Sequence, residues 1–463
     1  MIDQAVLERV LGAGLRTGGD FAEVFVEDRR TSSARLDDGV VEELGSSHDR
    51  GAGIRVVSGA TTGFAHTTDL TERGLVVAAE AASSAARSGS SGARTVALSR
   101  RPGSSVVPGP ERAGEPGKAA RVALLRRADD AARATGAQIS QVSASAGSGR
   151  RRFLVANSDG VLAEDDQVRT SLSVSCVAVG DGGRQTGAES VGRTIGFELF
   201  DDRTPEDVAG IAARRALGKL AARPAPSGTL PVVIGPGSGG VLFHEACGHG
   251  LEADLVRKAA SVFAGRVGEQ VASPLVTLVD DGTVSGEWGT GAIDDEGCAR
   301  ARNVLIEGGV LTDYLWDHLR ANDEGRASSG NGRRQSYRHL PMVRMTNTFL
   351  LAGEQDPAVI VRDTDHGVYI AKLGGGSVNT ATGDFVFRMT ESYLIEGGVI
   401  TDPLRGGNLT GNGPAVLGAI DACGSDFDMG GPGTCGKDGQ SVPVGLGQPT
   451  LRVTGMTVGG TAR

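Results

Sequence analysis

The feature that most constrains this chain is the ten-residue stretch FHEACGHGLE at 243–252. It contains two of the seven histidines, and Glu245 directly follows the first of them. An apolar run at 230–234 and a glycine-rich segment at 235–240 come before it, which predicts a buried strand, a turn and a helix that begins near Gly240. In metal hydrolases, histidines on such a helix hold a zinc ion and a glutamate handles a proton of water. The stretch therefore predicts either such a metal site or a helix end with two unrelated histidines.

The spacing of the two histidines is unusual. In the H-E-x-x-H motif they are four positions apart, about 40° around a helix, whereas five positions place His244 and His249 about 140° apart. One ion can contact both imidazoles only if the helix bulges or ends between them. Gly248 and Gly250 favour this, because glycine tolerates the backbone angles of a helix end. We therefore expect a distorted turn if the two histidines share a metal.

The glycines before this stretch allow a rival interpretation. Gly235, Gly237 and Gly240 match the dinucleotide-binding pattern G-x-G-x-x-G between a strand and a helix. Such a match is weak evidence in a chain with 72 glycines, and the repeated strand–helix alternation of a Rossmann sheet is absent. No Gly-Lys-Ser/Thr follows, which excludes a P-loop. The sequence therefore does not favour nucleotide binding.

Composition narrows the class of protein. The 463 residues are enough for two or three domains, and the many glycines with 4% aromatics favour turns and closely approaching strands over helical bundles. The net charge of −9 gives no support for a nucleic-acid-binding surface. Five widely spread cysteines do not form a disulfide framework, and neither a secretory signal nor an apolar run of membrane-spanning length is present. We expect a cytoplasmic protein without membrane or nucleic-acid partners.

Periodicity predicts an α+β fold, in which N-terminal antiparallel sheet units with helices precede a mostly antiparallel β domain that carries the metal-site helix. We predict four segments: an N-terminal unit at 1–87, a linker or surface excursion at 88–118, a second α+β unit at 119–223 and a β-rich domain at 228–463. Helices are expected at 3–17, 69–87, 119–135 and 204–222, where Thr-Pro-Glu-Asp provides a capped start.

Short strands are expected between these helices and through the last domain. In the N-terminal units we predict them at 22–27, 31–37, 39–45, 52–58, 60–66, 138–147, 150–156, 160–165, 168–180 and 185–194. In the last domain they are predicted at 275–280, 358–362, 367–373, 384–398 and 450–456. Two similar segments, 304–313 and 393–402, each predict a β-hairpin around a Glu-Gly-Gly turn.

A catalytic zinc normally has three protein ligands, so a third must lie elsewhere. His318, His339 and His366 are isolated among polar residues. Several carboxylates are candidates that cannot be ranked: Glu252, Asp254, Asp294, Asp295 and Glu296. Among cysteines, Cys247 would crowd the two histidines. Cys435 lies in a glycine-rich turn whose Lys437 would favour the thiolate, which binds zinc strongly. The residues alone leave the third ligand open between these choices.

Several segments resemble one family when taken together. The segment HEACGHGLEAD at 244–254 resembles the H-E-x-x-x-H motif of the TldD/PmbA family, on the TldD side. The tail GTCGKDGQSVPVG at 433–445 is similar to that family's Cys-Gly-Lys turn. The segments 294–297 and 344–348 resemble family segments in the same order. The resemblance is strong from about 229 to 462, and the helix–meander start is compatible with it.

The resemblance implies a zinc metallopeptidase that acts on short or unfolded peptides. In such an enzyme His244, His249 and Cys435 would hold Zn²⁺, and Glu245 would be the general base. The PmbA (TldE) branch lacks the ligands and serves as a partner subunit. This chain would therefore be the catalytic member of a heterodimer with a TldE/PmbA-like paralogue, or a homodimer. Peptides would bind as an added strand inside an enclosed cavity.

Two other functions remain open at this level. The family has been described as a modulator of DNA gyrase, so the chain could be a non-catalytic regulatory or binding protein. Metal content distinguishes that function from catalysis. A metal-dependent hydrolase of a non-peptide bond is the other alternative, which a panel of substrates would exclude.

Overall fold

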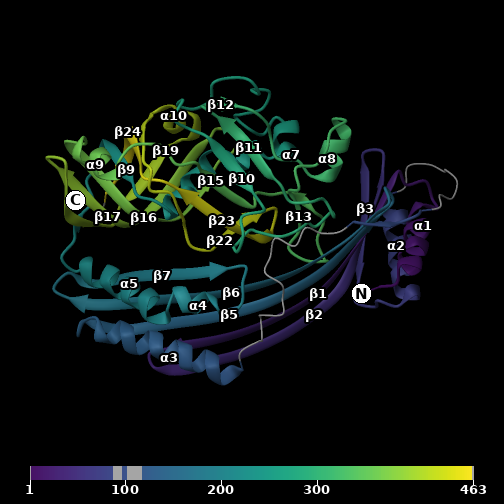
Figure 1. Cartoon of the computed structure of the whole chain (residues 1–463), viewed down its shortest axis with the longest axis horizontal. Helices are drawn as coiled ribbons and strands as arrows, with labels where there is room; N and C mark the ends of the chain where they lie inside the picture. Colours follow the sequence, from purple (N-terminus) through teal and green to yellow (C-terminus); the bar gives the residue numbers. More distant parts are fainter. Residues whose placement is uncertain (1, 87–95, 102–116, 461–463) are drawn as a thin grey trace.

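The computed structural model describes residues 2–86, 96–101 and 117–460. A long curved sheet lies along one side of the molecule, and the β-rich C-terminal part lies above it (Figure 1). Most of the predicted linker at 88–118 falls outside the described residues. No described helix is both long and apolar enough to cross a membrane.

The long sheet contains seven strands in the order β3-β2-β1-β5-β6-β4, with β7 also paired to β6. All neighbours are antiparallel except β4, which runs parallel to β6. The strands are β1 (Phe21–Asp37), β2 (Val40–Ser58), β3 (Thr61–Thr67), β4 (Ser99–Arg100), β5 (Ile139–Asn157), β6 (Val161–Gly180) and β7 (Gly183–Arg193).

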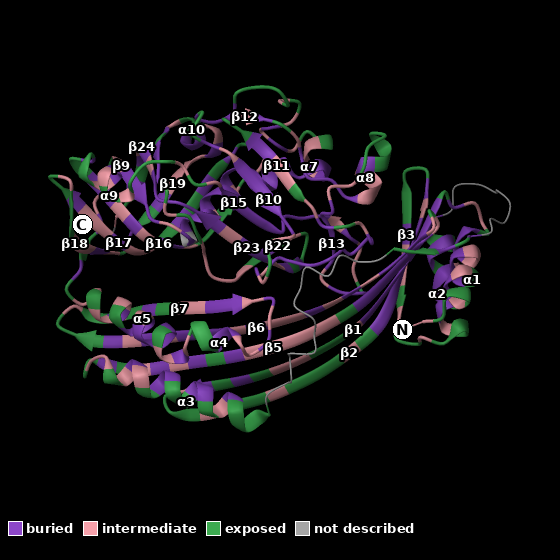
Figure 2. Ribbon diagram, in the orientation of Figure 1, coloured by how far each residue is buried: buried purple, intermediate pink, exposed green. Residues whose placement is uncertain are grey.

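The sheet differs from the prediction in the length of its strands. We predicted breaks within 22–37, 39–58, 138–156 and 160–180, and each of these regions is one continuous strand. The polar residues in the middle of β1 and β2 are compatible with a strand because that part of these strands is largely exposed (Figure 2). In β6 the polar residues Asp165, Gln167 and Thr170 are buried instead. Because β1 pairs with β5, one sheet runs through both predicted N-terminal units. Their division at 1–87 and 119–223 stays a prediction.

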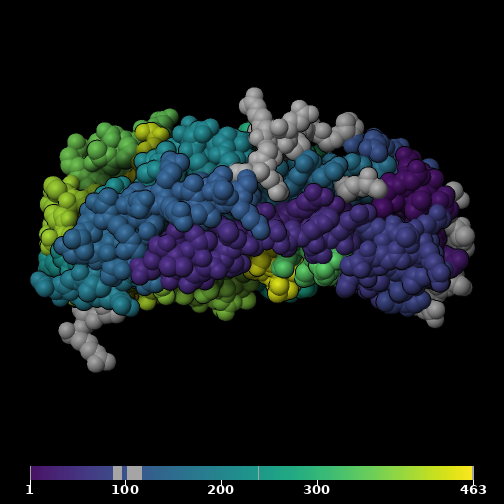
Figure 3. All heavy atoms as spheres, turned by 90° about the horizontal axis from the view of Figure 1, so that it is seen from below, coloured from purple at the N-terminus to yellow at the C-terminus, as the bar shows by residue number. Residues whose placement is uncertain are grey.

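Helices cover the two ends of the sheet and confirm the predicted helical regions. They are α1 (Gln4–Leu15), α2 (Glu72–Ala85), α3 (Lys118–Ala134), α4 (Leu199–Asp202) and α5 (Pro205–Gly218). The start of α5 follows its sequence signal, since the Thr204 hydroxyl accepts from the Asp207 amide at 3.1 Å and Pro205 is the first helical residue. Helices α1 and α2 pack on one end, and α3 and α5 pack on the other. Seen from below, the N-terminal half of the chain covers most of this side, and the C-terminal half shows along its edges (Figure 3).

The start of β1 is buried on both faces. All residues at 21–27 are buried, although a single covered face would bury only alternate ones. Val24 belongs to the core with α1 and α2. Phe25 belongs to a cluster with Ile293 and Tyr337 of the C-terminal part. This end of the sheet is therefore enclosed between its own helices and the C-terminal part.

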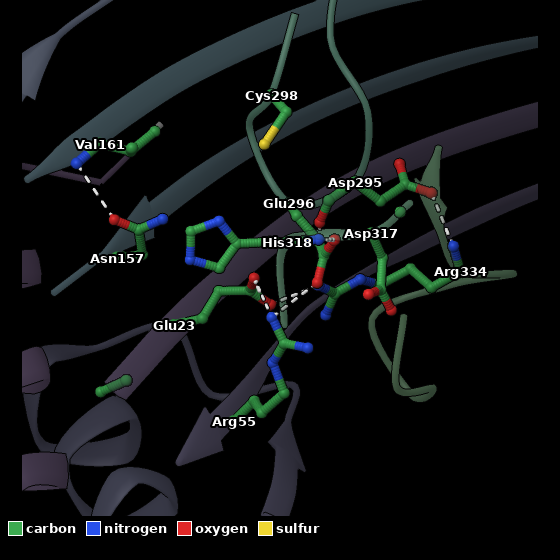
Figure 4. Close-up of polar contacts among 12 residues, drawn as sticks. Glu23, Arg55, Asn157, Val161, Asp295, Glu296, Cys298, Asp317, His318 and Arg334 are labelled. Carbon is green, nitrogen blue, oxygen red and sulfur yellow. Dashed lines mark hydrogen bonds and ion pairs between the residues drawn. The ribbon is translucent and has the colours of Figure 1, made fainter. Parts of the chain in front are cut away.

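Buried ion pairs join the same end of the sheet to the C-terminal part (Figure 4). Arg55 of β2 donates to Glu23 of β1 at 2.8 Å and to Glu296 at 2.9 Å. Arg334 also pairs with Glu23. The side chains of Glu23 and Arg334 are 0% exposed, so these charges depend on one another for compensation.

The C-terminal part contains two large sheets and a two-stranded ribbon, β13 (Gly332–Arg333) with β14 (Met342–Val343). The eight-stranded sheet has β8 (Arg223–Pro224), β9 (Gly228–Ile234), β16 (His366–Val378), β17 (Asp384–Glu396), β18 (Val399–Arg405), β19 (Asn408–Asn412), β20 (Ile420–Cys423) and β24 (Leu451–Gly459). The second sheet has β10 (Leu278–Asp281), β11 (Arg302–Glu307), β12 (Val310–Leu311), β15 (Asn347–Leu350), β21 (Asp428–Met429), β22 (Gly433–Lys437) and β23 (Gln440–Gln448).

Most of these strands are antiparallel, so the predicted α+β class with a β-rich C-terminal domain is confirmed. β16 pairs with both β9 and β17, which closes the five strands β16, β9, β24, β19 and β17 into a small barrel. The largest core of the molecule lies here and includes Leu242 and Phe243, directly before the histidine stretch.

Two local predictions in this part have different outcomes. Both repeated segments form hairpins, β11–β12 and β17–β18, and the two turn glycines of each have positive φ, as such turns require. The strand predicted at 358–362 is wrong, because α9 (Pro357–Arg362) occupies it. Asp356 caps this helix through the Ala358 amide, and Pro357 is its first residue, a start signal that the apolar run concealed.

Candidate metal centre

The histidine stretch forms a distorted helix, as the spacing predicts. It follows β9 through η2 (Ser238–Gly240), α6 (Val241–Phe243), the π-helical turn η3 (His244–Gly248), η4 (His249–Leu251) and α7 (Ala253–Arg257). The His249 amide donates to the His244 carbonyl, five residues back. This widened turn brings the two imidazole centroids to 4.9 Å. The predicted bulge between the histidines is therefore present.

The glycines of this turn serve packing rather than a helix end. Gly248 has helical backbone angles, φ −53° and ψ −52°. A Cβ there would lie 2.2 Å from the Met345 sulfur, and a Cβ on Gly250 would lie 2.8 Å from the Phe263 ring. From the sequence we expected these glycines to allow the backbone angles of a helix end. That reason is wrong, although the distortion itself is observed.

Cys435 reaches the histidines from the β22–β23 hairpin. One donor atom from each of His244, His249 and Cys435 lies within 4.8 Å of the others, and all three residues are buried. The Cys435 sulfur is 3.4 Å from Nε2 of His249. Two imidazoles and a thiolate are donors that zinc prefers, and three protein ligands leave a position for water. The structure thus brings together the three residues named from the sequence.

The surroundings favour a thiolate at Cys435. Burial alone would raise the pKa of this thiol, but the charges and hydrogen bonds of His244 and His249 lower its pKa to about 4. Nδ1 of His244 is buried and has no hydrogen-bond partner among the described residues. A buried nitrogen without a hydrogen-bond partner is consistent with a metal-binding site, and so is a thiol that is readily deprotonated.

His249 is oriented by an acidic residue behind it. Its Nδ1 lies 3.1 Å from Oε2 of Glu252, which leaves Nε2 directed toward Cys435. Burial would raise the pKa of Glu252, but His249 and Lys437 lower its pKa to about 2. Such a carboxylate fixes the tautomer and orientation of a ligating histidine.

Lys437 has a different role from the one predicted. It donates to Glu252 at 2.8 Å, to Asp254 at 2.7 Å and to the Val343 carbonyl at 3.1 Å. The sequence suggested that Lys437 would stabilise the Cys435 thiolate. Its hydrogen bonds instead go to the carboxylates behind His249, because the side chain leaves the hairpin next to them.

This arrangement makes Glu252 a sensitive position. In a Glu252→Gln variant we expect zinc affinity to fall about 10–100-fold, because His249 loses the charge that orients it. Competition with a chromophoric chelator measures the change. Asp254→Asn is the matched control: it also contacts Lys437 but not His249, and should reduce affinity less. Equal affinities for Glu252→Gln and the wild type would contradict this role.

Glu245 lies beside the donor cluster. With His244 it lines a cavity of about 350 Å³, whose other walls include glycines 374–376 of β16 and the segment 430–433, which consists of three glycines and Pro432. Burial raises the pKa of Glu245 above its ordinary value. The side chain therefore adjoins both the three donor residues and a space that can admit a ligand.

The other candidates named from the sequence lie elsewhere or act differently. The Cys247 thiol donates to the Phe243 carbonyl at 3.2 Å, and burial raises its pKa to about 12. His318 contacts Asp159, and His339 contacts Ser336. The remaining candidates do not join the cluster: His366 lies in β16, and Asp294, Asp295 and Glu296 lie near the buried ion pairs of Figure 4. Within the described residues, a single group has metal-ligand geometry.

Three family models match consecutive parts of the chain. PmbA/TldA metallopeptidase domain 1 matches 22–86, the central domain matches 111–220, and the C-terminal domain matches 227–460. The chain belongs to the PmbA/TldD metallopeptidase family. The donor set of two histidines and a cysteine supports the TldD branch of this family.

Named relatives of this PmbA/TldD member match between 64% and 96% of its length. The Metalloprotease TldD homolog of Haemophilus influenzae is 41% identical, over 96% of this chain and 93% of its own. The Zinc metalloprotease TldD homolog of Saccharolobus solfataricus is 29% identical, over 64% of this chain and 66% of its own. Among solved structures, TldE from Thermococcus kodakarensis has a TM-score of 0.78, with 19% identity, over 98% of this chain and 100% of that one. The last comparison supports the fold alone.

Proposed function

We propose that this chain is a zinc-dependent peptidase that hydrolyses peptide bonds in short or unfolded peptides. The observation that carries the proposal is the convergence of His244, His249 and Cys435, with donor atoms within 4.8 Å of one another. Glu245 beside them faces a cavity that can admit a ligand. The zinc in the name of the Saccharolobus solfataricus relative is consistent with this donor set.

The proposed ligands are the two imidazoles and the Cys435 thiolate. When bound, a zinc ion would polarise the scissile carbonyl and lower the pKa of water toward neutrality. The thiolate contributes more negative charge than a third imidazole would. Glu252 keeps His249 in the orientation that leaves Nε2 available.

Glu245 is the proposed general base. Its carboxylate would take a proton from the attacking water and pass it to the leaving amine as the peptide bond breaks. Burial raises its pKa, which brings the group closer to the neutral range in which a base is most effective. Glu245 lines the same cavity as His244, which suits both transfers.

The cavity beside Glu245 supports an extended peptide as the substrate. The register between β16 and β17 shifts between Leu373 and Gly376, so the intervening glycines leave the regular ladder. Gly374, Gly375 and Gly376, together with Gly430, Gly431 and Gly433, carry no side chains that would keep a peptide backbone away, and Pro432 is the exception in the second segment. A folded protein could not present an extended segment there without local unfolding.

The partner and the compartment are also proposed. The relative from Thermococcus kodakarensis carries the name TldE and shares the fold. We propose a heterodimer between this chain and a TldE/PmbA-like paralogue, with a homodimer as the alternative, in the cytoplasm.

The proposal is tested by metal content and peptide cleavage. We expect about one zinc per chain, and cleavage of a labelled unfolded peptide that a chelator abolishes and added zinc restores. A stably folded substrate should resist, and the assay is run with and without the paralogue. If fresh protein neither contains nor takes up zinc, a regulatory function becomes the better explanation.

A further inference from the structure

A second cavity, of about 400 Å³, lies between the long sheet and the β22–β23 hairpin. Strands β1, β5 and β6 form one wall, and the hairpin with parts of the segments around Trp288, Arg300 and Arg333 forms the other. Figure 1 shows the hairpin above the middle of the curved sheet. Seven arginines line this cavity, whereas Asp295 is the one acidic residue among its described lining residues.

The arginines of this cavity differ in whether a carboxylate compensates their charge. Arg151 pairs with Asp295 and with a carboxylate of β1, and Arg334 pairs with Glu23. Arg150 pairs with Asp166, and Arg29 is exposed. Three further arginines, which are less exposed than Arg29, form no ion pair with any carboxylate that the structure describes. These three, Arg169, Arg300 and Arg333, will be called the unpaired arginines.

The unpaired arginines donate only to main-chain carbonyls. Arg169 contacts the Trp288 carbonyl at 3.0 Å, and Arg300 contacts the Gly330 carbonyl at 2.6 Å. Arg333 donates to Pro443 of the hairpin at 2.6 Å. These bonds fix the guanidinium groups in place, but neutral carbonyls do not balance their charge.

The energetic cost of this arrangement is substantial. Arg300 is 9% exposed and Arg333 is 3% exposed, and a buried charge is costly unless an opposite charge compensates it. Burial and the charges of Arg151 and Arg300 lower the pKa of Arg169 to about 9. Burial and the charge of Arg300 also lower the pKa of Arg333. The protein concentrates positive charge here, and an anion in the cavity would relieve the repulsion.

The second cavity adjoins the metal centre. Thr434 lines both this cavity and the one that contains Glu245. Pro443, which accepts from Arg333, is the cross-strand partner of Thr434, and Cys435 is the next residue of β22. A molecule that crosses Thr434 can therefore contact both the proposed base and the unpaired arginines.

We propose that the unpaired arginines bind a carboxylate of the peptide substrate, either its C-terminal carboxylate or an acidic side chain. Guanidinium groups bind carboxylates through paired, charge-assisted hydrogen bonds. The identity of the ligand rests on the proposed peptidase function, whereas the excess of positive charge does not. Peptides with a carboxylate at the correct distance from the scissile bond are then the preferred substrates.

Binding to zinc-loaded Glu245→Gln protein tests this inference. Four N-terminally labelled, alanine-rich octapeptides are compared by fluorescence anisotropy. The peptides of one pair differ in the C-terminus, which is free or amidated. The peptides of the other pair differ in one internal residue, which is glutamate or glutamine. Removal of the recognised carboxylate should weaken binding about 10–100-fold. The pair that shows the loss identifies whether the C-terminus or the side chain is bound.

Arg300→Gln, made in the Glu245→Gln protein, should reduce the preference for the peptide that carries the recognised carboxylate to less than about threefold. Arg302→Gln is the matched control, since this arginine is two residues away, half-exposed and outside the cavity. It should keep the full preference. If Arg300→Gln does not fold, the comparison of the four peptides on the parent protein still decides the question.

Equal binding of all four peptides, or binding of none, would overturn the inference. Cleavage by the wild-type enzyme separates it from the proposed function. An enzyme that cleaves all four peptides equally well is a peptidase without a carboxylate site. A protein that prefers the acidic peptides in binding but cleaves none has the site and lacks the proposed activity.

Discussion

Replacement of Cys435 by alanine is expected to reduce bound zinc from about one per chain to near zero and to abolish peptide cleavage. The thiolate is the anionic member of the donor set, and its charge offsets that of the cation. The two imidazoles that remain form an incomplete site. The loss of affinity should exceed the roughly 10–100-fold effect of changing a residue behind a ligand, such as Glu252. Elemental analysis of dialysed protein measures the stoichiometry.

Cys247→Ala is the control for this experiment. Cys247 is also a buried cysteine in the same part of the molecule, but its thiol donates to the Phe243 carbonyl and is not part of the donor cluster. Its replacement should leave the zinc content unchanged. A Cys435→Ala protein that keeps one zinc per chain would exclude Cys435 as a ligand and reopen the choice among nearby carboxylates, with Glu252 the first to examine.

Glu245→Gln is expected to keep its zinc and to lose about 10²–10⁴-fold in kcat. The amide has nearly the shape of the carboxylate but cannot accept the proton of water. Because Glu245 is not one of the three clustered residues, metal content and folding should match the wild type. Single-turnover cleavage of a labelled peptide, alongside zinc analysis, measures both quantities.

An exposed carboxylate provides the comparison. Glu269 pairs with Arg266 at the surface, and Glu269→Gln should change neither zinc content nor kcat. Full activity in a zinc-loaded Glu245→Gln protein would remove Glu245 from the mechanism. A variant that lost zinc together with activity would instead assign it to metal binding.

Sequence patterns were most informative where the determinants are local. The caps of α5, the glycine turns of the two hairpins and the five-residue histidine spacing each depend on a few neighbouring residues. The spacing required a distorted turn, and η3 provides it. Cys435 lies 186 positions from His249, so spacing alone left it one candidate among several, and the family resemblance singled it out.

Features that depend on pairing between distant segments were not predictable in the same way. The long strands of the first sheet were divided into short pieces because their polar middle parts resemble turns when the neighbouring strands are unknown. The unpaired arginines, Arg169, Arg300 and Arg333, come from three separate segments and match no motif. Lys437 was assigned to Cys435 from adjacency in sequence, whereas its partners, Glu252 and Asp254, are set by the fold.

The position of the β22–β23 hairpin has a consequence for biosynthesis. Synthesis proceeds from the N-terminus, so His244 and His249 leave the ribosome well before Cys435, which lies 186 positions after His249. The donor set is therefore incomplete until the β22–β23 hairpin has been translated. A nascent chain that ends before Cys435 cannot form the proposed three-residue zinc site. Assembly of the metal centre thus separates chains that contain the hairpin from shorter products that lack it.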